Sequence, residues 1–270
     1  MPILRDIALG RYVAIDSPLH RLDPRTKFVC TMVVMMATIT TEHPLAIGFA
    51  ATVVVALTAL GRLPARLLLR NLRPFAWLFL FTFVLHGLMT PGRVLWHVPL
   101  LDLDLTVTGL RQGSLLSLRL AVVISAAALM TLTTAPMELT DGLERMLSPL
   151  RRLGFPAHEL AMMVTIALRF IPVLAEEAER LYKAQAARGG DFTGGPLQRA
   201  RKLVPLLVPL FISAFSRADR LALAMESRCY RGGEGRTSYR RLQLGWLDLA
   251  AALSTAGVAA GIAWLPRVMA

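Results

Sequence analysis

The stretch Pro74–Gly92 reads PFAWLFLFTFVLHGLMTPG and contains no Asp, Glu, Lys or Arg over 19 residues. A helix needs about 20 mostly apolar residues to cross the hydrocarbon core of a membrane. The whole 270-residue chain is 55% hydrophobic and only 18% charged, which excludes a disordered chain and most soluble globular domains. The stretch therefore predicts a membrane-spanning helix and directs attention to similar runs along the chain.

Four further runs lack charged residues, so we expect an all-α membrane protein with about five transmembrane helices. A span needs at least about 17 residues, and only the run Phe28–Thr41 falls short of that length. We expect it to reach full length if Arg25 and Lys27 extend their charged ends toward the lipid headgroups. Asp23-Pro24 predicts an N-cap followed by a proline in the first turn. The remaining runs are Leu45–Gly61, Leu120–Met137 and Leu249–Pro266.

The distribution of Lys and Arg predicts the orientation of the spans, because short cytoplasmic loops are enriched in these residues. The segment before the first run has five of them and the loop Arg62–Arg73 has four, whereas the connection Pro91–Gly109 has only Arg93. We therefore expect a multi-pass protein of the cell (inner, cytoplasmic) membrane with its N-terminus in the cytoplasm. Counting onward places Met137–Arg241 in the cytoplasm and the C-terminus outside.

The region from Asp141 to Arg241 is the polar half of the chain, with 17 of the 30 basic and 10 of the 18 acidic residues. Apolar residues recur at helical spacing over Ala157–Arg188 and about Leu197–Arg228, and a shorter amphipathic piece covers about Glu138–Arg152. We expect three helices that lie at the inner membrane surface without crossing it. The expected organisation is residues 1–137 with four spans, 138–241 with the three helices, and 242–270 with the last span.

The apolar face of the first long helix, centred on Leu160, Ile171 and Ala178, requires a covering partner. A second membrane protein and the neighbouring helices are both compatible with the pattern. The proline residues inside the two long helices, at positions 172, 205 and 209, are expected to bend them along the membrane.

Both long helices end in an arginine flanked by small residues. The first ends in Ala187-Arg188-Gly189 and the second in Ser227-Arg228-Cys229, shortly before Gly232-Gly233. The simpler interpretation is capping, because arginine complements the negative end of a helix and glycine adopts the left-handed conformation there. The alternative is a docking contact, because a guanidinium forms bidentate bonds to a partner's carboxylate or carbonyl groups. Two instances 40 residues apart, both in a basic region, raise this alternative beside the capping interpretation.

Five motifs between about residues 10 and 241 occur together in one order. They are Ser17–Lys27 (SPLHRLDPRTK), Ala167–Pro172 (ALRFIP), Ala186–Gly189 (AARG), Val204–Pro209 (VPLLVP) and Arg231–Thr237 (RGGEGRT). In this combination the chain resembles the transmembrane subunit of energy-coupling-factor (ECF) transporters. This is the EcfT family, related to the CbiQ and BioN subunits of cobalt and biotin transporters.

The resemblance implies a coupling subunit of an importer of the ATP-binding-cassette class, serving a vitamin or another micronutrient. Its partners would be two cytoplasmic ATPases, of the EcfA and EcfA′ type, and a small substrate-binding membrane protein, the S component. In the family, paired Ala-Arg-Gly-type motifs end two coupling helices that enter grooves of the ATPases. They correspond to Ala187-Arg188-Gly189 and Ser227-Arg228-Cys229, of which the second keeps only the arginine. A cobalt- or nickel-type CbiQ subunit is the alternative within the class.

ATP and Mg²⁺ are then expected on the partner subunits, because the chain has no GxxxxGK[ST] phosphate loop. We expect no catalytic residue, cofactor or metal site in this chain. The main alternative is an independent membrane transporter or enzyme. The five histidines are scattered without an HExxH motif, and only His86 lies inside a predicted span, where it is expected to donate an interhelical hydrogen bond or, less simply, to form a site.

The isoelectric point near 11.0 would also suit a nucleic-acid-binding protein. The sequence contains no recognisable nucleic-acid-binding module, however, and cytoplasmic enrichment in basic residues accounts for the charge. We therefore expect the lipid bilayer, and no nucleic acid, as the surrounding partner.

Overall fold

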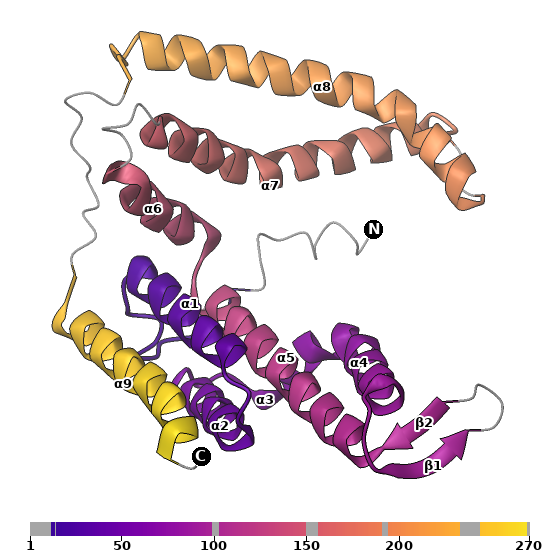
Figure 1. The fold of residues 1–270 in the computed structure, drawn as a ribbon. Helices are drawn as coiled ribbons and strands as arrows, with labels where there is room; N and C mark the ends of the chain where they lie inside the picture. Colours follow the sequence, from indigo (N-terminus) through magenta and orange to yellow (C-terminus); the bar gives the residue numbers. More distant parts are fainter. Residues whose placement is uncertain are drawn as a thin grey trace. The chain divides into compact units, whose positions relative to one another are not determined.

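The computed structural model describes residues 12–13, 15–98, 103–149, 156–190, 194–232 and 244–268 (Figure 1). The chain forms two compact units. The first contains residues 12–135 and 242–270, and the second contains residues 136–241. Within the described ranges, every regular element is a helix apart from one short β-hairpin.

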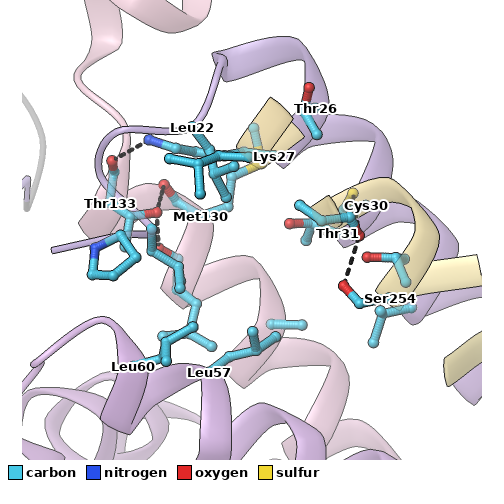
Figure 2. Close-up of a pocket in the computed structure, with 18 of the residues that line it drawn as sticks. Leu22, Thr26, Lys27, Cys30, Thr31, Leu57, Leu60, Met130, Thr133 and Ser254 are labelled. Carbon is cyan, nitrogen blue, oxygen red and sulfur yellow. Dashed lines mark hydrogen bonds between the residues drawn. The ribbon is translucent and has the colours of Figure 1, made fainter. Parts of the chain in front are cut away.

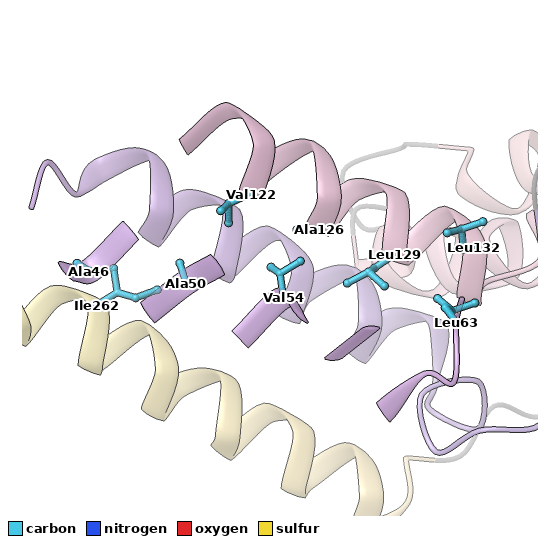
Figure 3. Packing of buried hydrophobic residues seen from close by; sticks show 9 residues of the cluster. All are labelled: Ala46, Ala50, Val54, Leu63, Val122, Ala126, Leu129, Leu132 and Ile262. Carbon is cyan, nitrogen blue, oxygen red and sulfur yellow. The ribbon is translucent and has the colours of Figure 1, made fainter. Parts of the chain in front are cut away.

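The first unit is built around α5, Val107–Thr133. Helices α1 (Pro24–Thr40) and α2 (Pro44–Leu60) each pack against α5 and also against α9, Trp246–Val268. Small side chains at the contacts let these backbones approach closely, as is common between membrane helices. Figure 3 shows the resulting core, whose buried members are Ala46, Ala50, Val54, Leu63, Val122, Ala126, Leu129, Leu132 and Ile262.

The predicted third span begins earlier than its charge-free run. Helix α3 (Ala65–Leu72), a 3₁₀ turn (Arg73–Phe75) and α4 (Ala76–Met89) form one helical stretch of 25 residues. The expected loop Arg62–Arg73 is therefore helical over most of its length, and that prediction was wrong. Helix α3 is strongly amphipathic, so its arginines remain exposed while Leu67, Leu68 and Leu72 are partly buried, although Leu69 is also exposed.

The predicted fourth span also differs at both ends. Helix α5 begins at Val107 rather than near Leu120, so it contains Arg111 and Arg119, and it ends at Thr133. Its first half packs closely on α4. The approach is so close that a Cβ atom at Gly109 would collide with the carbonyl oxygen of His86. The connection that precedes α5 is an antiparallel hairpin of β1 (Val94–Val98) and β2 (Leu103–Thr106), which the sequence pattern did not predict.

The apolar helices are long enough for a multi-pass membrane protein, as predicted. By length and composition, the stretches Ala65–Met89, Val107–Thr133, Ala157–Ala187 and Trp246–Leu265 can cross a membrane, and the apolar helix Pro44–Leu60 is shorter. The fold is thus that of an all-α membrane protein with roughly five transmembrane helices. The stretch Ala157–Ala187 also meets the length and composition criteria, although its sequence pattern predicted a helix at the membrane surface.

The second unit consists of three helices, α6 (Pro136–Leu147), α7 (Ala157–Ala187) and α8 (Pro196–Glu226), close to the predicted ranges. His158 Nδ1 lies 2.7 Å from Glu144 Oε1 and links α7 to α6, and Arg217 Nη2 lies 3.4 Å from Glu177 Oε2 and links α8 to α7. Figure 1 shows α7 and α8 side by side and antiparallel. The expected prolines lie inside these helices, and α7 is visibly bent in its middle.

Three polar residues of the motif Ser17–Lys27, namely Ser17, Asp23 and Lys27, form a buried junction in the first unit. Asp23 caps α1 through a 3.0 Å bond from the backbone N–H of Arg25, as predicted. Ser17 Oγ contacts His20 Nδ1 at 2.7 Å, and His20 Nε2 donates to the carbonyl of residue 13 at 3.0 Å. The short motif therefore folds onto itself before α1 begins.

Lys27 does not extend toward the headgroups, contrary to the prediction. It is only 7% exposed. Its ammonium donates to the carbonyl of Thr133 at 2.9 Å (Figure 2) and to that of His20 at 3.2 Å. The last carbonyls of a helix have no partner within the helix, so Lys27 satisfies one at the end of α5. The same side chain lines an apolar cavity of about 380 Å³ among α1, α2, α5 and α9.

Asp248 completes the junction at the start of α9. One carboxylate oxygen accepts the backbone N–H of Asp23 at 2.8 Å, and the other accepts the backbone N–H of Gly245 at 2.8 Å. The second bond is the reciprocal half of a capping box. A residue more than 200 positions away thus joins the beginnings of α1 and α9.

Replacing Lys27 by Met should lower the free energy of unfolding by about 2 kcal/mol, because buried carbonyl groups would lose their donor. Thermal unfolding of the purified protein in detergent measures the effect. Lys183→Met is the matched control, because Lys183 is exposed and pairs only with Glu179 on the surface of α7. Equal melting temperatures of the two variants would contradict the structural role of Lys27.

Candidate functional site

Helix α7 ends in a left-handed cap. Gly189 has φ of +87°, the conformation that glycine adopts most readily. The backbone N–H of Gly190 donates to the carbonyl of Gln185 at 2.9 Å, and that of Arg188 reaches the same carbonyl at 3.1 Å. This pattern is typical of a Schellman motif and confirms the capping role predicted for Gly189.

Helix α8 ends in the same backbone geometry as α7. The N–H groups of Arg228 and Tyr230 both reach the carbonyl of Met225 at 3.1 Å. Cys229 has φ of +57° and occupies the position of Gly189. The predicted glycine break at Gly232-Gly233 is therefore not the cap. Gly232 has positive φ but lies after it, and Gly233 lies outside the described residues.

The arginine side chains take no part in either cap. Arg188 and Arg228 are exposed, as are their neighbours Ala187 and Ser227. Among the described residues, neither guanidinium has a hydrogen bond or an ion pair. Backbone N–H groups satisfy the final carbonyls of both helices, so each guanidinium remains available to bind a carboxylate or carbonyl group of another protein.

The two arginines lie at opposite ends of the α7–α8 pair. The helices are antiparallel, and the contact between Glu177 and Arg217 lies 11 residues before each arginine. At 1.5 Å per residue, the two helix ends are on the order of 30 Å apart along the pair. The α7–α8 pair therefore carries two similar exposed arginines, one at each end.

Large apolar side chains are exposed on the surface of the second unit. Val208, Phe211, Ile212 and Phe215 of α8 are all at least 60% exposed. On α7, Leu160 and Ile171 of the predicted apolar face are each 40% exposed, and Ala178 is partly buried. The α8 surface was not predicted as a binding face. Its signal in the sequence was the apolar run Leu203–Phe215, which is too short to span a membrane.

The remaining candidates from the sequence form no catalytic cluster. His86 Nδ1 donates to the carbonyl of Thr82 in its own helix at 3.0 Å, so the predicted interhelical bond was wrong. In the part of the chain that the structure describes, no three His, Cys, Asp or Glu side chains could hold a metal ion together. The Arg231–Thr237 motif lies mostly outside the described residues.

These features define a class of protein, a multi-pass helical membrane protein with two exposed arginine-ended helices. Residues 16–239 match the family model CbiQ, described as cobalt transport protein. The chain is 49% identical over 259 residues to the energy-coupling factor transporter transmembrane protein EcfT of Thermosediminibacter oceani, covering 96% of this chain and 97% of the relative. It is 45% identical over 242 residues to EcfT of Bacillus subtilis, covering 89% and 91%.

The EcfT of Thermanaerovibrio acidaminovorans is 45% identical over 270 residues, covering all of both chains. The chain therefore belongs to the CbiQ/EcfT family and is the transmembrane component of an energy-coupling factor transporter. The similarity extends through the last span, for which the motifs gave only position and hydrophobicity.

Cys229→Gly should stabilise the end of α8 by about 1 kcal/mol or less. It removes the cost of a left-handed side-chain-bearing residue and adds the backbone entropy cost of glycine. Hydrogen exchange at the Tyr230 amide should slow relative to the wild type. Ser227→Gly is the matched control, because Ser227 has φ of −64° and gains nothing from glycine. Faster exchange in Cys229→Gly would contradict the shared cap geometry.

Proposed function

We propose that the chain couples two ATP-binding-cassette ATPases to a small substrate-binding membrane protein during uptake of a vitamin or another micronutrient. Arg188 and Arg228 contact one ATPase each, together with Ala187, Gly189, Ser227 and Cys229 beside them. ATP and Mg²⁺ bind to the ATPases, and this chain contributes no catalytic residue. The observation that supports the proposal is the repeated helix end, with one backbone geometry and one unpaired, exposed arginine at each place.

Two equivalent contacts suit two similar partners. A guanidinium that is already free of intramolecular bonds keeps all of its donors for a groove on the partner. The long helices move as rigid elements, and the contact between Arg217 and Glu177 ties them together. Motion of either ATPase is thus carried along a helix about 46 Å long, since each has 31 residues.

The motion reaches the membrane unit at the buried junction. Two of the passages of the chain between the units lie next to this junction in sequence. One follows Thr133, whose carbonyl binds Lys27, and the other precedes Asp248, which binds Asp23. A pull on either connection is therefore resisted by the same set of buried hydrogen bonds.

The exposed apolar surface of α8 is the contact for the substrate-binding membrane protein. Exposure of a large apolar surface to water is unfavourable and indicates a site of interaction. Here the surface consists of Val208, Phe211, Ile212 and Phe215. Helices α7 and α8 lie at the cytoplasmic membrane surface, with the N-terminus on the same side. The second half of α7 is charged, with exposed Glu176 and Arg180. This supports a position at the membrane surface rather than across the membrane.

A cobalt-type transporter is the second candidate, because the matching family model carries that description. Similarity to EcfT proteins over nearly the whole chain favours the ECF type. Substrate recognition in either case lies with the substrate-binding partner.

Arg188→Ala and Arg228→Ala should each weaken binding of an ATPase by roughly tenfold, as expected for a buried interface arginine. The double variant should lose ATP-dependent uptake, measured in cells and in proteoliposomes, while membrane insertion stays normal. Arg180→Ala and Arg220→Ala are matched controls, because both arginines are exposed on the same two helices. Normal uptake together with normal recovery of the complex in the double variant would refute the assignment.

A further inference from the structure

A polar cavity of about 440 Å³ lies in the first unit. It is bordered by the turn between α1 and α2, by α4 and by the first half of α5. Its lining includes Glu42, His86, Arg111, Gln112, Leu115 and Arg119. Such a concentration of ionisable groups is unusual among membrane-spanning helices, where charged side chains mark functional sites by default.

The two arginines of the cavity lack counter-ions. Arg119 donates through Nη2 to the carbonyl of Thr41, at the end of α1, while its buried Nε has no partner. In the part of the chain that the structure describes, neither Arg111 nor Glu42 forms an ion pair or a hydrogen bond through its side chain. With one carboxylate against two guanidinium groups, the cavity carries an uncompensated positive charge.

The depth of the cavity follows from unequal helix lengths. Helix α1 starts beside Thr133 and ends beside Arg119, whereas α5 continues for 12 more residues to Val107. The turn between α1 and α2 is therefore about 18 Å short of the end of α5. Arg119 lies at the bottom of this recess and Arg111 lies nearer the end of α5.

Exposed leucine side chains occur next to lining residues of the cavity in the sequence. Leu45 and Leu118, which adjoin its lining residues in sequence, are 50% and 41% exposed. A ligand that offers both an anion and hydrocarbon chains fits this combination better than a small soluble anion. The positive-inside count places the same end of the bundle in the outer leaflet.

We propose that this cavity binds the phosphate group of a membrane phospholipid. Arg111 and Arg119 form charge-assisted bonds to the phosphate oxygens, for which guanidinium geometry is well suited. Gln112 offers further donors, because its side-chain amide carries two N–H groups. Leu115 and the exposed leucines contact the acyl chains. The bound lipid then fills the space left by the short α1–α2 turn.

Native mass spectrometry of the intact transporter, titrated with palmitoyl-oleoyl phosphatidylethanolamine, tests the proposal. The wild type should retain one lipid more tightly than the rest, and Arg111→Gln should weaken that binding roughly tenfold. Arg111 is exposed at the cavity, so this variant should fold normally, and its melting temperature verifies that. Arg119→Lys, which keeps the charge and loses the guanidinium fork, should weaken the same lipid to a smaller extent.

Arg93→Gln is the matched control, because Arg93 is exposed near the hairpin and does not line the cavity. Equal lipid retention in Arg111→Gln and the wild type would overturn the proposal. A second arm replaces the lipid with inorganic phosphate. If phosphate alone binds with the same dependence on Arg111 and displaces the lipid, the site takes a free anion and the lipid assignment is wrong.

Discussion

The first unit depends on hydrogen-bond donors for the last carbonyl groups of α5. These carbonyls lie among packed apolar helices, where an unsatisfied polar group is costly. Two residues supply the missing donors. The backbone N–H of Val13, before α1, donates to the carbonyl of Leu132, and the ammonium of Lys27, in the first turn of α1, donates to that of Thr133. Asp248 then fixes α9 to the same point. The motif Ser17–Lys27 therefore joins α1 to the end of α5 and to the start of α9.

The repeated helix end has a simple physical logic. A helix that terminates in a left-handed residue satisfies its own carbonyls through the backbone, and the neighbouring side chain is released from that task. Arg188 and Arg228 gain their availability in this way. The match between Gly189 and Cys229 in backbone conformation explains how the second motif can differ in sequence and still present its arginine similarly.

The apolar helices could be predicted from the sequence because a membrane-spanning helix requires a long run of apolar residues. Their ends were misplaced because charged residues were treated as span boundaries. Arg111 and Arg119 lie within α5, and the arginines of α3 lie on its exposed side. Burial of Lys27 depends on carbonyls over 100 positions away, and the free state of the two arginines depends on backbone dihedrals. Neither follows from local pattern, whereas the motifs at the helix ends were visible in the sequence.

Affinity purification of the chain from its native membrane in mild detergent, followed by mass spectrometry, tests the coupling role most directly. The account predicts recovery of two ATP-binding-cassette ATPases and at least one small membrane protein, whose identity would reveal the substrate class. Recovery of the chain alone, with and without crosslinking before solubilisation, would contradict the account and would favour an independent membrane transporter or enzyme.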